Sequence, residues 1–88
     1  MQATNYHEVE AQLIEWVRDM SGFEGTIEAH DNFIKSGWLD SFAVLGLIMQ
    51  IEQYYSFKFE MHELANPELQ IIQTMAKTVF NKMYKTQK

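Results

Sequence analysis

The fold is decided by the stretch Gly37-Trp38-Leu39-Asp40-Ser41-Phe42-Ala43-Val44-Leu45-Gly46-Leu47-Ile48-Met49-Gln50-Ile51. It starts as a loop, because Gly37 suits a tight turn, and it continues as an apolar run with helical spacing. We predict a helix over residues 41–55 that begins directly after Asp40. Its core face unites five apolar residues at i, i+3, i+4, i+7 and i+11: Val44, Leu47, Ile48, Ile51 and Tyr55.

A second apolar stripe on this helix predicts a binding surface. Phe42, Leu45 and Met49 recur at i, i+3 and i+7, outside the core face. A surface helix normally carries a single stripe, and surplus apolar surface on a small domain often marks a partner site. The alternative interpretation is that another element of the fold covers these three side chains.

Two more long helices are predicted, one near each end of the chain. The first spans residues 6–20, with Asn5 as N-cap and Glu8 three residues later, as in a capping box. Its apolar stripe comprises Val9, Leu13, Trp16, Val17 and Met20, whereas Glu10, Glu15 and Arg18 fall on the other side. The last helix spans residues 67–84, because Asn66-Pro67 followed by Glu68 is a strong start signal.

The connections complete an all-α architecture. Residues 21–39 form a long first loop whose apolar side chains are expected to pack across the bundle. Phe57-Lys58-Phe59 is interpreted as an extended connector, and residues 60–65 as a short third helix. We therefore expect one domain over residues 1–88, with an ordered core at about 5–84, built as a four-helix bundle with a long first loop.

Composition narrows the class of protein. The net charge is −5, all twelve acidic residues lie between Glu8 and Glu68, and the last twelve positions hold Lys77, Lys82, Lys85 and Lys88. An acidic surface argues against nucleic-acid binding and suits a partner protein with a basic surface. The alternative interpretation is that the acidic residues only increase solubility. No apolar run reaches the ~20 residues of a membrane span, and residues 1–5 do not resemble a leader. We expect a cytoplasmic monomer.

Several chemistries find no support in the sequence. The chain has no cysteine, so thiolate metal sites and cysteine nucleophiles are excluded. His7, His30 and His62 lack a second ligand at helical spacing, and there is no Gly-rich phosphate loop. A hydrolase that uses Ser41 would need a histidine base beside it, and no motif indicates one. We therefore expect neither catalysis nor a metal site.

Asp40 and Ser41 are the remaining candidates for a functional site. On these two residues alone, a simple helix cap explains the pattern. A phosphodiester on Ser41 would nevertheless be favourable, because free N–H groups and the helix dipole at a helix start stabilise an anion. Both interpretations place the serine hydroxyl at the exposed first turn of the helix.

The chain resembles the acyl and peptidyl carrier proteins from about Val9 to Val79. The resemblance is carried by Asp31-Asn32-Phe33, Gly37, Asp40-Ser41-Phe42, Ile51-Glu52, Tyr55, Pro67-Glu68-Leu69 and Ile72. It implies a four-helix bundle that bears 4′-phosphopantetheine on Ser41, with Asp40 recognised by the phosphopantetheinyl transferase. Phe42 stands where the family usually has leucine, which preserves an apolar contact beside the arm.

The motif spacing resembles one branch of this family. Two residues separate Gly37 from Asp40, as in stand-alone D-alanyl carriers and carriers of dedicated pathways, whereas carriers of fatty-acid synthesis usually have one. The second helix also holds only one acid, Glu52. The resemblance thus implies a role in a specialised pathway, such as nonribosomal peptide, lipopeptide or polyketide synthesis or cell-envelope modification.

The resemblance also implies the partners. An adenylating acyl or aminoacyl ligase would load the arm as a thioester, and an acyltransferase or synthase would receive the cargo. Phe42, Leu45 and Met49 would form the apolar docking stripe, with Glu60, Glu63 and Glu68 as steering charges. The competing hypothesis is a non-catalytic helical interaction domain that has a carrier-like fold and does not use Ser41.

Overall fold

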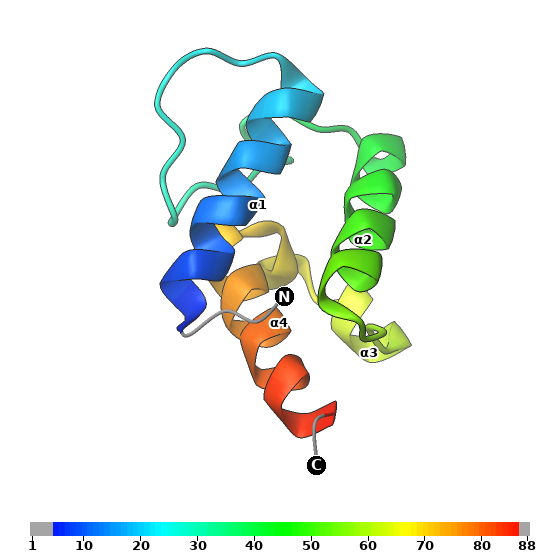
Figure 1. Cartoon of the computed structure of the whole chain (residues 1–88). Coiled ribbons are helices and arrows are strands. Elements are labelled where there is room, and N and C mark those ends of the chain that lie inside the picture. The colour runs from blue at the N-terminus through cyan, green and yellow to red at the C-terminus, as the bar shows by residue number, and fades with distance from the viewer. Residues whose placement is uncertain (1–4, 87–88) are drawn as a thin grey trace.

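The protein is all-α over the residues that the computed structural model describes, 5–86. The helices are α1 (Tyr6–Ser21), α2 (Ser41–Tyr55), α3 (Met61–Leu64) and α4 (Ile72–Thr86), and a 3₁₀ turn, η1 (Pro67–Gln70), precedes α4. The expected domain of residues 1–88 extends beyond this range, and of the segment 1–5 that does not resemble a leader, residues 1–4 lie outside it. The prediction of a long first loop and a short third helix is confirmed (Figure 1).

The core lies where α1, α2 and α4 meet. Helix α1 packs mainly along α4, and α2 (green in Figure 1) stands beside this pair. The connector after α2 adds Phe57 and Phe59, whose rings meet edge to face with centroids 4.9 Å apart. The side chains with essentially no exposed surface come from all three long helices and from the loop: Val9, Leu13, Val17, Phe33, Leu47, Ile51, Ile72, Met75, Ala76 and Val79.

The long loop is tied to the start of α4. The Phe33 N–H donates to the Gln70 carbonyl at 3.0 Å, while the N–H groups of Ile72 and Gln73 donate to the carbonyls of Asp31 and Ala29 at 3.1 and 2.7 Å. Loop carbonyls thus satisfy N–H groups that a helix start leaves unpaired.

This attachment corrects the prediction of one continuous helix over residues 67–84. Ile71 adopts an extended conformation (φ −89°, ψ 128°) and pairs with Asn32 in an isolated antiparallel bridge. The start signal at Asn66-Pro67 produces only the 3₁₀ turn η1, and the α-helix begins afresh at Ile72. The tertiary pairing with the loop overrides the local helical pattern at this point.

Two positions on α1 also differ from the sequence prediction. Glu10, expected on the polar side, is only 8% exposed. Its Oε1 lies within hydrogen-bond distance of His7 Nδ1, at 3.1 Å. Met20, expected in the core stripe, is 40% exposed. The buried face of α1 therefore includes Glu10, and Met20 lies in the last turn of the helix.

An ion pair joins α3 to α4. Glu63 Oε1 lies 3.0 Å from Lys82 Nζ and also accepts the Glu60 N–H at 2.7 Å, with 21% of the glutamate side chain and 16% of the lysine side chain exposed. Burial alone would raise the pKa of Glu63, but the Glu60 N–H and the Lys82 ammonium outweigh it, so the pKa lies below its usual 4.5.

We expect Glu63→Gln to lower the free energy of unfolding at pH 7 by about 0.5–1 kcal/mol, because glutamine keeps the capping acceptor and loses only the charge. A lowered native pKa stabilises the fold at pH values above 4.5, and this contribution disappears as the pH falls through the native pKa. Urea denaturation from pH 7 to pH 3 should therefore show the two proteins converging in acid. Glu24→Gln, an exposed loop substitution, is the control, and a constant gap across this range would contradict the assignment.

Candidate functional site

Asp40 caps helix α2 and thereby fixes the position of Ser41. The Asp40 backbone is extended (φ −89°, ψ 176°), and its Oδ1 accepts the Ala43 N–H at 2.7 Å. The helix then begins at Ser41, whose side chain is exposed. The predicted bounds of this helix, residues 41–55, are confirmed, and the aspartate performs the capping function that either residue was able to fill.

The first turn of α2 is suited to an anion. The start of a helix leaves the N–H groups of Ser41 and Phe42 without intrahelical acceptors, and the helix dipole adds partial positive charge there. The first turn contains no acidic side chain. A phosphate on the Ser41 oxygen would therefore meet free donors, and Asp40 directs one carboxylate oxygen to the helix rather than to the solvent.

The loop before Asp40 is held by a buried side chain and by backbone hydrogen bonds. Leu39 is 4% exposed, and its N–H donates to the Phe33 carbonyl at 3.1 Å. Gly37 has φ +81°, a left-handed conformation that glycine adopts without strain, and its N–H donates to the Ile34 carbonyl at 2.9 Å. The turn expected at Gly37 is confirmed, and it directs the chain from the buried Phe33 to the exposed Ser41.

The second stripe of α2 is exposed. Phe42 is 83% exposed, Leu45 58% and Met49 62%, so the residues described do not include an element that covers these side chains. Met61, at the start of α3, is 86% exposed as well. Sequence analysis missed Met61, because a single apolar residue in a four-residue helix has no periodicity, and only its exposure distinguishes it. We call Phe42, Leu45 and Met49 the apolar patch.

The outer face of α2 offers little charge. Its single acid, Glu52, turns inward to the connector, where its Oε2 accepts the Phe59 N–H at 2.9 Å. Among the acids expected to steer partners, Glu60 and Glu68 are exposed. Glu63 is half-buried, and its carboxylate pairs with the Lys82 ammonium.

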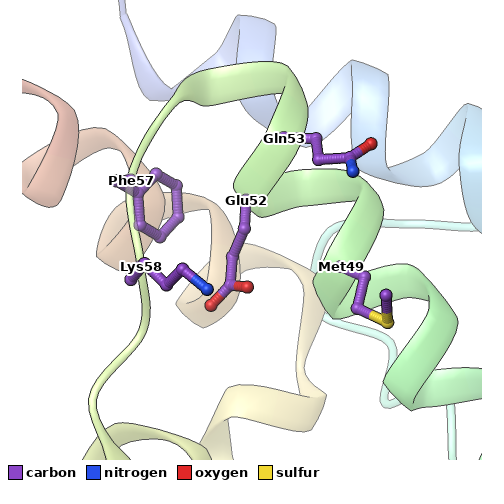
Figure 2. A pocket seen from close by; sticks show the side chains of 5 residues that line it. All are labelled: Met49, Glu52, Gln53, Phe57 and Lys58. Atoms are coloured by element: carbon purple, nitrogen blue, oxygen red, sulfur yellow. The ribbon is translucent and has the colours of Figure 1, made fainter.

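A hollow of about 190 Å³ lies at the far end of α2. Figure 2 shows its lining, with Glu52 directed from the helix toward the connector that carries Phe57 and Lys58. At 1.5 Å per residue, Glu52 is about 16 Å along the helix from Ser41. Glu52 and Lys58 are charged and Gln53 is polar, which differs from the mostly apolar lining expected of a long acyl chain site.

Other chemistries gain no support from the structure. The three histidines lie on α1, in the loop and on α3, and residues 5–86 contain no group of three or more histidine, aspartate or glutamate side chains placed to hold a metal ion. Within the same part of the chain, every helix is too short or too polar to cross a membrane.

Comparison with known proteins agrees with this geometry. A family model described as "Phosphopantetheine attachment site" matches residues 11–76, which is well over half of the chain. The matched span contains the Asp40 cap, Ser41, all of α2 and α3, and the part of the loop that is joined to α4. Neither the curated proteins nor the solved structures gave a significant match.

Proposed function

Because the chain belongs to the phosphopantetheine-attachment family, we propose that it is an acyl or aminoacyl carrier protein that bears 4′-phosphopantetheine on Ser41. The observation that carries this assignment is the exposed Ser41 hydroxyl at the first turn of α2, directly after the Asp40 cap. The cargo would pass between partner enzymes of a dedicated pathway, such as nonribosomal peptide, lipopeptide or polyketide synthesis or cell-envelope modification, and the chain itself would catalyse no step.

The residues present fit the arm. Ser41 provides the oxygen that forms the phosphodiester, and the free N–H groups of the first turn receive the phosphate charge. Since the chain contains no cysteine, the working thiol comes from the arm, which when attached supplies the sulfur that holds the cargo as a thioester. Asp40 keeps the helix start, and therefore the serine, in one orientation.

Attachment transfers the phosphopantetheine group from coenzyme A to Ser41. The Ser41 oxygen forms a new bond to the phosphorus of coenzyme A, the phosphoanhydride bond of coenzyme A breaks, and the nucleotide leaves. The transferase takes the proton from the Ser41 hydroxyl. The cap leaves this hydroxyl exposed, so the incoming phosphorus meets no side chain that has to move.

The decisive experiment is mass spectrometry after incubation with coenzyme A and a broad-specificity phosphopantetheinyl transferase. We expect the intact protein to gain roughly 340 Da, the mass of one arm. An unmodified protein under conditions that modify a reference carrier would contradict the proposed function. A serine-directed fluorophosphonate probe tests the hydrolase alternative, and we expect it to leave Ser41 unlabelled.

Asp40 offers a test that separates capping from recognition. Asp40→Asn keeps an oxygen that accepts the Ala43 N–H, whereas Asp40→Ala loses the cap at a cost of about 1 kcal/mol. Asp40→Asn should fold with wild-type stability. If the transferase recognises the carboxylate of Asp40, as we propose, this variant will accept the arm at least tenfold more slowly than the wild type. Equal modification rates for Asp40→Asn and wild type would show that Asp40 acts only as a cap.

The apolar patch is proposed as the docking surface for partner enzymes. Its three side chains are uncharged, and the one acid of α2 faces the connector, so the complementary surface is apolar, with basic groups that complement Glu60 and Glu68. Apolar anchors at the centre of an interface contribute most of its free energy.

We expect Leu45→Lys to raise the KM of the transferase for the carrier about tenfold, because a charge would be buried against the apolar partner. Gln50→Lys, on the other exposed side of α2, is the matched control and should change KM less than twofold. Both variants should keep the wild-type helix content by circular dichroism, since both positions are exposed. An equal KM for Leu45→Lys and wild type would show that the patch is not part of the interface with the transferase.

The second candidate function is a helical interaction domain that binds through the same patch without the arm. The exposure of Phe42, Leu45 and Met49 favours it, because none of the three contributes to the core. A Ser41→Ala protein that fully supports the host pathway would establish this alternative, whereas loss of pathway product would support the carrier function.

A further inference from the structure

Two aromatic rings close the loop that precedes Ser41. The ring of Phe23, at the start of the loop, lies against Trp38, near its end, with centroids 4.9 Å apart and planes inclined by 31°. We call this pair the aromatic clasp. Trp38 comes three residues before Ser41, which places their Cα atoms within about 11 Å of each other. The clasp therefore adjoins the serine.

Gly25 provides the space that the Phe23 ring occupies. A Cβ at residue 25 would lie 2.5 Å from Phe23 Cζ and 2.8 Å from Cε2, much closer than real contacts. Gly25 does not share the positive φ of Gly22 and Gly37, so its backbone accepts alanine without strain. Adding one methyl group would displace the ring while leaving both aromatic residues in the chain.

The clasp joins a sparsely bonded part of the loop to a firmly held part. The hydrogen bonds described in this loop are concentrated in residues 28–39, which are linked to η1 and α4. At the other end, the Phe23 N–H donates to Ser21 Oγ at 3.1 Å. The Phe23 ring then brings this end of the loop to Trp38.

The position of the clasp suggests more than core packing. Phe23 remains 36% exposed and lies outside the set of residues that form the core or pack on it. Trp38 is half-buried against the core and also contacts the Phe23 ring, whereas Leu39 is buried and donates a hydrogen bond to the Phe33 carbonyl. Together these contacts define the path of the chain into the Asp40 cap.

We propose that the aromatic clasp is a positioning device for Ser41, which holds residues 38–40 in the conformation that the phosphopantetheinyl transferase binds. This inference rests on the carrier function proposed above. When the clasp opens, only part of the population keeps the competent conformation, and the apparent affinity falls by that fraction. The chemical step on the bound carrier does not change.

The test measures transferase kinetics with coenzyme A on Gly25→Ala, Phe23→Ala and Phe23→Tyr. For the first two variants we expect the KM for the carrier to rise about fivefold, the order expected when one aromatic pair is lost, with kcat and the KM for coenzyme A unchanged. Phe23→Tyr keeps the ring and should restore the wild-type KM. The indole N–H resonance of Trp38 should shift in Gly25→Ala if the methyl group displaces the Phe23 ring. If that resonance does not shift, Phe23→Ala, which removes the ring outright, decides the test.

Tyr54→Ala is the matched control, because it also removes a ring from an aromatic contact, with Trp16 at 5.2 Å, but at the far end of α2. It should lower stability and leave the KM unchanged. Wild-type KM values for both Gly25→Ala and Phe23→Ala would overturn the positioning role while leaving the carrier function intact. If the wild type gains no arm, the carrier function fails and this inference fails with it.

Discussion

Ser41→Ala will abolish attachment of the arm and leave the fold intact. The hydroxyl is the proposed acceptor, so the gain of roughly 340 Da that we expect for the wild type should be absent after prolonged incubation with coenzyme A and transferase. Stability should hardly change, because Asp40 makes the capping hydrogen bond and the Ser41 side chain is exposed. Alanine is also a better helix former than serine.

Ser36→Ala is the control for this experiment. Ser36 is an exposed serine of the loop that precedes α2, five residues before Ser41, and its substitution should leave the mass gain unchanged. Thermal unfolding followed by circular dichroism should give similar midpoints for all three proteins. A mass gain that persists in Ser41→Ala would place the arm elsewhere, and peptide mapping would then identify the modified residue.

Phe33→Ala is expected to produce the largest loss of stability, about 3–5 kcal/mol. Phe33 is 1% exposed although it belongs to the loop, and its backbone bonds both Gln70 and Leu39. Removing the ring leaves a cavity in the core. Since small domains are stable by only about 5–15 kcal/mol, this change should unfold a substantial fraction of the protein at physiological temperature.

Urea denaturation of Phe33→Ala and Lys35→Ala separates this effect from a general sensitivity of the loop. The Lys35 side chain is exposed, and its replacement should change the free energy of unfolding by less than about 0.5 kcal/mol. Phe33→Leu should lie between the two, because it refills part of the cavity. A loss below about 1 kcal/mol for Phe33→Ala would contradict the assignment of the loop to the core.

Local patterns predicted the elements that depend on neighbours in sequence. The bounds of α2 follow from the Asp40 cap and the apolar run, and the extended connector follows from the alternation of Phe57 and Phe59 with Lys58. In each case the signal and the structure lie within a few residues of each other, so propensity and capping were sufficient.

Predictions failed where a contact joins distant parts of the chain. The break at Ile71 depends on Asn32, thirty-nine positions earlier, and Glu10 is buried although the helical pattern places it on the polar side. The pairing of Glu63 with Lys82, nineteen positions later, likewise has no signal in the sequence. No periodicity in sequence reports such contacts, because each is set by packing.

For this protein, sequence alone determined the all-α class, the start of α2 and the serine displayed there, because caps and helical periodicity act over a few residues. Only the tertiary structure decided which of its apolar and charged side chains remain available to a partner. Phe42, Leu45, Met49 and Met61 stay exposed while equally apolar neighbours are buried, and the clasp of Phe23 and Trp38 forms because the loop returns on itself. Exposure is a property of the whole packed chain, since a residue is covered or left free by elements far from it in sequence.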